Sequence, residues 1–333
     1  IAESLMNSKP DSALAVLDGI PVSDVKGKET SARYALLKSM ALDKNYIDTT
    51  TFDILQPAID YYIEHGTPNE RLRTYYYQGR IYQNQGDDDS AMQSFMNGCD
   101  LRESITDSLL LAHTLVAQGT LYLKQYKTGE FIHNNEEAAK LYGAIGKEVL
   151  EIKSYTKALD GYVMMNNKSM ADSILSICMP LAQKNPEGEA YLFPSFLSYT
   201  VELGSSDDIK IFLDEYQDLE LTKDETLNFA QGYSKIGEYD KALNFISKIT
   251  PSKFTLDSIK YTLVKTDILE KQGRYEEALG LYKDYSVMLE RYQKELISQD
   301  LLFSDKKHQL EMKNLTEIRD KDRIIGLTLC SIF

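Results

Sequence analysis

The fold is constrained most by a spacing of small and large residues that recurs along the chain. In residues 72–104, Gly79 and Tyr82 lie about one helical turn apart, and Ala91 and Phe95 do so again after an interruption at Gly86. This pattern predicts two helices that pack against each other across a tight turn. The same offsets of three, nine and four residues occur in three sets: Gly79, Tyr82, Ala91 and Phe95; Ala230, Tyr233, Ala242 and Ile246; and Thr266, Leu269, Ala278 and Tyr282. A repeated helical hairpin is therefore expected.

The residue sizes in this pattern have a packing reason. Gly79 and Ala91 are expected where the two helices meet, because antiparallel helices approach closely only where a side chain is nearly absent. Tyr82 and Phe95 are expected to fill the space beside that contact. The same packing role is predicted for the other two sets and for Gly119, Tyr122, Ala138, Tyr142 and Ala171.

Turn glycines keep the same register as the helices. Gly86, Gly237 and Gly273 each follow the first small position of their set by seven residues. With the pattern in three places and a turn glycine in each, the chain resembles the tetratricopeptide repeat (TPR) family, whose unit is about 34 residues long. The resemblance implies an all-α fold, a right-handed α-α superhelix (TPR-like solenoid) of about seven to eight helical hairpins plus a long C-terminal helix.

The hairpins before the central repeat are less regular. Residues 1–17 read as the end of one helix, a turn and a second helix, so the first hairpin is expected to be truncated. The next spans 31–65, with its second helix around Ile54 and Ala58. The sequence of this hairpin and of the helix after it is similar to that of a group of Bacteroidetes TPR proteins. The segments that carry the similarity are ALLKSMALDKNYID, PAIDYYIEHG and YYYQGRIYQNQGD. That resemblance covers about the first third of the chain and implies repeats outside the cytoplasmic membrane, followed by one membrane helix.

The hairpins after the central repeat depart from the regular spacing in three ways. Tyr122 and Ala138 are seven residues further apart than expected, so the turn between them is predicted to be longer. In the next hairpin Asn166 replaces the turn glycine, since Asn tolerates left-handed backbone. Pro194 is expected in the first turn of the helix that carries Leu197.

The C-terminal sequence predicts a different element. The repeat array is expected over residues 1–292, and residues 293–323 are predicted as a long helix because they hold no Gly or Pro. Residues 324–333, IIGLTLCSIF, are interpreted as the start of a truncated transmembrane helix, since ten residues are half of what a span requires. The basic residues just before them weakly favour a cytoplasmic flank, whereas the family resemblance implies a periplasmic location at the inner membrane. The latter is our prediction, with a cytoplasmic location as the alternative.

Composition excludes some functions. The net charge of -14 and the pI near 4.9 argue against nucleic acid, whose phosphates require a basic surface. The three cysteines, Cys99, Cys178 and Cys330, are too far apart for a disulfide framework or a metal motif.

No residue pattern predicts catalysis, a cofactor or a metal. The sequence has no phosphate loop, HExxH motif or nucleophile elbow, and the four histidines are isolated from one another. Residues 87–89 are acidic but lack the EF-hand spacing, so Asp87 or Asp88 is expected to cap a helix. Of the histidines, His113 is expected to face a concave groove.

That groove is the predicted site. In TPR proteins the first helix of each hairpin lines the concave face, and the register of the central repeat then selects Arg73, Tyr76, Tyr77, Arg80, Gln83 and Asn84, with His113 from the next repeat. Arg offers bidentate donors to a carboxylate, and Tyr offers rigid contact area. The alternative is that the tyrosines pack between hairpins and the arginines are solvated.

The predicted function is a non-catalytic scaffold or sensor that binds a protein or peptide and is tethered through its C-terminal helix in a bacterial signalling protein. A close alternative is a cytoplasmic TPR regulator of a signalling peptide, and a remote one is a helical enzyme that uses scattered carboxylates. The partner, the signal and the oligomeric state do not follow from the sequence, because TPR arrays bind many unrelated targets.

Overall fold

The computed structural model describes residues 1–250 and 256–294, and all the regular elements in these ranges are helices. The chain divides into two compact units, with the boundary between Leu203 and Gly204. The helices of the first unit are α1 (Ala2–Leu5), α2 (Pro10–Asp18), η1 (Val22–Asp24), α3 (Lys28–Lys44), α4 (Gln56–His65), α5 (Pro68–Gln85), α6 (Asp88–Cys99), η2 (Arg102–Ser104), α7 (Ser108–Lys124), α8 (Thr128–Ala144), α9 (Glu148–Met164), α10 (Lys168–Ala182) and α11 (Pro186–Leu203). Those of the second are α12 (Ser206–Tyr216), α13 (Lys223–Lys235), α14 (Tyr239–Ser247) and α15 (Leu256–Lys271), followed by a helix over residues 275–294.

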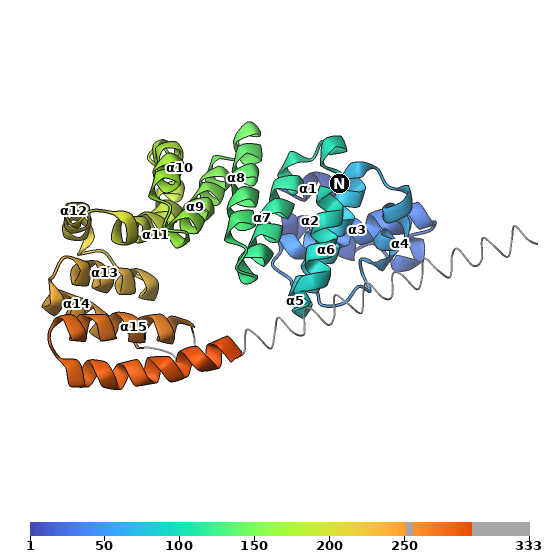
Figure 1. The fold of residues 1–333 in the computed structure, drawn as a ribbon. Helices are drawn as coiled ribbons and strands as arrows, with labels where there is room; N and C mark the ends of the chain where they lie inside the picture. Colours follow the sequence, from blue (N-terminus) through green and yellow to red (C-terminus); the bar gives the residue numbers. More distant parts are fainter. Residues whose placement is uncertain (251–255, 295–333) are drawn as a thin grey trace, which may run out of the picture. The chain divides into compact units, whose positions relative to one another are not determined.

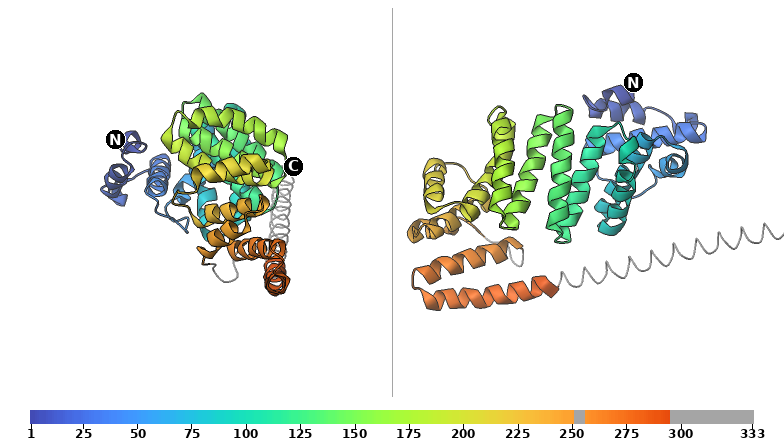
Figure 2. Two further views of the ribbon diagram at one scale, coloured as in Figure 1. Left: turned by 90° about the vertical axis from the view of Figure 1, so that its left-hand side faces the viewer. Right: turned by 45° about the horizontal axis from the view of Figure 1, so that its top comes forward.

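In the first unit, helices adjacent in sequence pack as hairpins, and each hairpin packs on the next (Figure 1). Figure 2 shows α7, α8 and α9 side by side. The buried residues form a series of local clusters. One cluster joins α3, α4 and α5 around Leu36, Ala58 and Ile81, and another joins α9, α10 and α11 around Leu159 and Leu175. This serial arrangement of cores is that of a helical repeat protein, so the predicted all-α, TPR-like fold is confirmed.

Capping and turn chemistry fixes the ends of these helices. Thr67 and Glu70 form a reciprocal capping box at the start of α5. Asp87 caps α6 by accepting from the Ser90 amide at 3.3 Å, as predicted. The turn between α5 and α6 places Gly86 at φ 76°, and Asn166 takes the equivalent left-handed conformation at φ 53°, also as predicted.

In the central hairpin, Gly79 of α5 lies against Phe95 of α6. A Cβ atom added to Gly79 would lie 2.4 Å from Cε1 of Phe95. The missing side chain of Gly79 therefore accommodates the Phe95 ring, and Ala91 is fully buried. Gly79 and Phe95 therefore form a pair in which a large side chain fills the space left by a small residue. Such a pair restricts the residues allowed at both positions more than two small residues would.

The same pair explains a wrong prediction in the last described hairpin. Tyr282 was expected to pack like Phe95, but its side chain is 53% exposed. The position equivalent to Gly79 is Thr266, which is itself buried, so its side chain occupies space that the glycine leaves open. In the hairpin of α13 and α14, the equivalent residues are Ala230 and Ile246, and both are buried.

The predicted long turn between α7 and α8 is also wrong. α7 ends at Lys124 and α8 begins at Thr128, so the seven additional residues extend α8 by about two turns. A Cβ atom on Gly119 would contact Asn135 at 3.1 Å, one turn after Phe131. Ala138 and Tyr142, assigned to this contact from the sequence, are buried instead against the beginning of α7.

Two predicted helix boundaries also require correction. Pro194 lies in the interior of α11, because that helix begins eight residues earlier at Pro186, where Asn185 accepts from the following amides. Ile54 precedes α4 and is 37% exposed, whereas its neighbour Leu55 is fully buried.

The predictions for residues 295–323 and for the apolar segment 324–333 lie outside the described residues. Within the described ranges, no helix has both the length and the apolar character needed to cross a bilayer.

Candidate functional site

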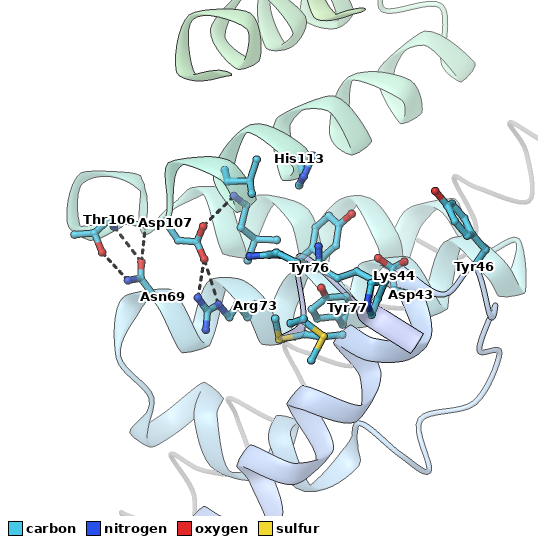
Figure 3. A pocket seen from close by; sticks show the side chains of 16 residues that line it. Asp43, Lys44, Tyr46, Asn69, Arg73, Tyr76, Tyr77, Thr106, Asp107 and His113 are labelled. Carbon is cyan, nitrogen blue, oxygen red and sulfur yellow. Dashed lines mark hydrogen bonds and ion pairs between the residues drawn. The ribbon is translucent and has the colours of Figure 1, made fainter. Parts of the chain in front are cut away.

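The first helices of three successive hairpins, α3, α5 and α7, border an open cavity of about 760 Å³ in the first unit (Figure 3). We call it the first cavity. It is lined by Met6, Asn7, Pro10, Met40, Asp43, Lys44, Tyr46, Asn69, Arg73, Tyr76, Tyr77, Thr106, Asp107, Leu109, Leu110 and His113. The lining contains apolar, aromatic and charged groups, as is typical of a site that recognises an organic ligand.

One end of the cavity is an ordered polar network between α5 and α7. The Asn69 side-chain oxygen accepts from the backbone amides of Thr106 and Asp107, and its Nδ2 donates to the Thr106 hydroxyl at 2.7 Å. Asp107 caps α7 by accepting from the Leu110 amide with one carboxylate oxygen. Its other oxygen accepts from Nε and Nη2 of Arg73, at 3.2 and 2.9 Å.

This network fixes the orientation of the Arg73 guanidinium. Nε and Nη2 are held by Asp107, while Nη1 has a weak contact with Glu3 at 4.0 Å. Since Arg73 is about one-third exposed, the ion pair adds little stability but positions the group. The Nη1 donors remain available for a ligand at the cavity, which suits a carbonyl or a carboxylate.

Tyrosine rings form an apolar wall. Tyr76 and Tyr77 are in edge-to-face contact, with ring centroids 5.1 Å apart. Burial raises the pKa of the Tyr76 phenol to about 12, and burial also raises the pKa of Tyr77 well above its ordinary value. Both phenols are therefore neutral at pH 7. Tyr77 also packs in the cluster of α3, α4 and α5, so it supports the cavity as much as it lines it.

His113 closes the cavity on the α7 side. Its Nδ1 lies 2.6 Å from the Tyr142 hydroxyl. Burial lowers the pKa of His113, and the nearby Lys44 ammonium lowers it further. The imidazole is thus neutral at pH 7, and its Nδ1 can accept the proton of the Tyr142 hydroxyl. Because it is held by Tyr142, His113 acts as a fixed polar wall between α7 and α8.

Tyr46 stands at the other end of the cavity from Asn69 (Figure 3). It follows α3, has φ 57° and is 96% exposed. A β-carbon disfavours this left-handed conformation by about 1–2 kcal/mol, and glycine is the usual residue there. The Ile47 amide donates to the Leu42 carbonyl oxygen at 3.0 Å, so this conformation ends α3 in the same way as the turn at Gly86 ends α5. The feature that points to binding is the exposed aromatic ring at the rim of a cavity.

The predicted groove residues divide into two groups. Arg73, Tyr76, Tyr77 and His113 line the first cavity. The other three, Arg80, Gln83 and Asn84, lie further along α5 and outside the lining, beside the end of α3 and the segment that follows it. Arg80 reaches Asp43 at 3.4 Å and donates to Gln83 at 3.0 Å. Asn84 donates to the backbone oxygen of Thr49 at 3.0 Å.

Several lining residues were not predicted from the sequence. Asp43 and Lys44 lie at the end of α3, and Tyr46 follows it at the start of the connection to α4. That connection is longer than a TPR turn, and its length is the one sequence signal for this part of the site. Asp107 is a helix cap by its position, and nothing in the sequence shows that it also holds Arg73.

In the ranges covered by the structure, no three His, Cys, Asp or Glu side chains are grouped so as to hold a metal ion. Burial raises the pKa of the Cys99 and Cys178 thiols to about 11, so neither is an activated nucleophile.

The fold and the first cavity define a TPR-like helical repeat protein with a ligand-sized opening between hairpins. Among solved structures, the chain is similar to the crystal structure of a Rap protein complexed with competence and sporulation factor. The TM-score is 0.54 at 12% sequence identity, and the match covers 90% of this chain and 97% of the other. The likeness shows a shared fold. No protein-family model and no curated protein sequence matches the chain.

Proposed function

We propose that the first unit is a non-catalytic module that binds a peptide or an unfolded protein segment in the first cavity. The observation that carries this proposal is the juxtaposition of the oriented Arg73 and the exposed Tyr46 at a cavity of about 760 Å³. The left-handed backbone of Tyr46 belongs to the turn after α3, whereas its ring is 96% exposed and open to a ligand. Arg73 and the Tyr46 ring suit a ligand that offers a polar backbone and side chains for packing.

The cavity chemistry indicates an extended ligand with mixed polarity. Arg73 and Lys44 supply donors, Tyr76 and Leu110 supply apolar contact area, and His113 supplies a neutral polar group. Among the described residues, no hydrogen bond or ion pair engages the Lys44 ammonium. A peptide backbone with its carbonyl groups, together with one apolar side chain, would satisfy this arrangement.

A pool of synthetic octapeptides with randomised sequence tests the proposal. The pool is mixed with the protein, and retained peptides are identified by mass spectrometry after gel filtration. Wild type is expected to retain a defined subset, and Arg73→Met, which keeps the aliphatic stem, should lose most of it. Arg102→Met is the matched control, because Arg102 pairs with Glu137 outside the cavity. Equal retention by wild type and Arg73→Met would place binding elsewhere.

We further propose that this module is the extracytoplasmic part of a membrane-tethered bacterial signalling or regulatory protein. The apolar sequence of residues 324–333 and the resemblance to Bacteroidetes TPR proteins support this location. The alternative is a cytoplasmic regulator of a signalling peptide, which is supported by the fold shared with a Rap protein solved with competence and sporulation factor. Protease treatment of intact spheroplasts distinguishes them, since a module on the outer side is digested and a cytoplasmic one is protected.

A further inference from the structure

A second cavity, of about 460 Å³, lies in the first unit between α7, α8, α9 and α11. The side chains that line it include His113, Tyr142, Lys153, Lys157, Asp160 and Tyr191. His113 lines both this cavity and the first cavity. The hydrogen-bonded pair of His113 and Tyr142 therefore lies between the two cavities.

Two lysines of α9 face this second cavity. Lys153 and Lys157 are four residues apart and therefore lie on the same side of the helix, where like charges repel. Burial lowers the pKa of Lys157 and Lys153 lowers it further, while Asp160 opposes both effects. In the part of the chain that the structure describes, no ion pair joins either ammonium group to a carboxylate.

The positions of the two ammonium groups are defined by their neighbours. Lys153 Nζ lies 3.7 Å from the centroid of the Tyr191 ring of α11, a cation-π contact that orients it. Asp160 accepts a hydrogen bond from the Ser195 side chain, so its carboxylate is shared between α11 and the lysines. Two cations and one anion leave one surplus positive charge in a partly desolvated cavity, in a protein whose net charge is -14.

We propose that the second cavity is a subsite for a single carboxylate group, held between Lys153 and Lys157. One carboxylate balances the surplus charge and relieves the repulsion between the lysines, whereas a neutral group would do neither. Resting on the proposed function, this subsite takes the acidic part of a ligand whose remaining residues occupy the first cavity. The carboxylate is that of an acidic side chain or of a peptide C-terminus.

Small probes test the subsite without the rest of a ligand. Protein labelled with ¹³C-lysine is titrated with N-acetylglutamate α-methylamide, which carries a side-chain carboxylate, and with N-acetylglycinate, which carries a chain-end carboxylate. N-acetylglutamine α-methylamide is the neutral isostere. The Cε signals of Lys153 and Lys157, assigned from Lys153→Met and Lys157→Met, should shift with a carboxylate and not with the neutral probe. The acid that binds more tightly shows whether the carboxylate comes from an acidic side chain or from a peptide C-terminus.

Substitutions give the expected fold-changes. Lys157→Met should raise the dissociation constant of the better carboxylate probe about tenfold or more, since it removes one charge-assisted contact. Lys140→Met, an exposed lysine of α8 outside the lining, is the control. Asp160→Asn keeps the shape and the acceptor for Ser195 but removes the competing carboxylate, so it should tighten binding several-fold.

The proposal is overturned if both acids shift Lys153 and Lys157 no more than the neutral probe does, or if Asp160→Asn weakens carboxylate binding. These outcomes are separable from those for the first cavity. A protein that binds the carboxylate probes but retains no octapeptide keeps the subsite and loses the proposed peptide function. A protein that retains octapeptides but does not bind the carboxylate probes supports the proposed peptide function and contradicts the subsite.

Discussion

Tyr46 provides the sharpest test of whether the first cavity was shaped for binding rather than for stability. Its side chain is 96% exposed, so removing the ring loses almost no burial. At φ 57°, replacement by glycine relieves about 1–2 kcal/mol of backbone strain. Glycine also gives the unfolded chain more freedom, which offsets about 0.4–1 kcal/mol of that gain. The net expectation for Tyr46→Gly is stabilisation by about 0.5–1 kcal/mol.

Urea unfolding of the full chain measures this change, and the octapeptide pool measures binding on the same samples. Tyr46→Gly should be more stable and retain fewer peptides. Tyr46→Ala keeps the strained Cβ and removes the ring, so it should match wild-type stability but bind like Tyr46→Gly. The matched control is Tyr126→Gly, since Tyr126 also has φ 57°, is 64% exposed and lies outside the first cavity. It should leave binding unchanged.

Two results would refute this reasoning. If Tyr46→Gly destabilises the protein by more than about 1 kcal/mol, the side chain has a structural role that its exposure does not show. If both Tyr46 variants retain the wild-type set of peptides, the exposed ring does not contribute to the site.

Three further predictions concern packing and titration. Gly79→Ala should destabilise the protein by roughly 1–3 kcal/mol in urea unfolding, because its Cβ would lie 2.4 Å from the Phe95 ring, whereas Gly129→Ala, with open space around it, should not. Ala242→Leu overpacks a fully buried position and should cost a similar amount; an unchanged unfolding midpoint would contradict the assigned repeat register. Burial raises the pKa of Asp160 from 3.8 to about 6. Between those values the folded protein holds a proton that the unfolded chain has lost, so this group's contribution to stability falls as pH rises through the window. Asp160→Asn should remove that slope, on the order of 3 kcal/mol in total, and an identical pH profile would contradict burial of the carboxylate.

The repeat architecture could be predicted because its determinants are local. Gly86 with its left-handed backbone and Asp87 with its cap are read directly from the order of residues. The tertiary partner of each position is less accessible from sequence. The offsets place Gly79 beside Ala91 and Phe95 equally well, and only the packed helices show that Phe95 fills the glycine site. For the same reason, seven additional residues after Tyr122 could lengthen either a turn or a helix.

The candidate site was predicted only in part, because a cavity depends on residues from several hairpins. The helical register selected Arg73 and His113, since both lie on first helices. It did not select Lys44 or Tyr46, which reach the cavity from the end of α3. The surplus charge at Lys153 and Lys157 depends on which carboxylates approach from α11, and no spacing rule within one helix supplies that information.

The most direct test of the central claim is a methyl NMR titration with a peptide retained from the pool. Met6 and Met40 line the first cavity, whereas Met96 and Met170 are exposed residues outside it. Protein labelled with ¹³C-methyl methionine, with signals assigned by single Met→Leu substitutions, reports both locations at once. The account predicts shifts at Met6 and Met40, with Met96 and Met170 unchanged. Shifts confined to Met96 or Met170 would contradict it, because the bound peptide would then lie outside the first cavity.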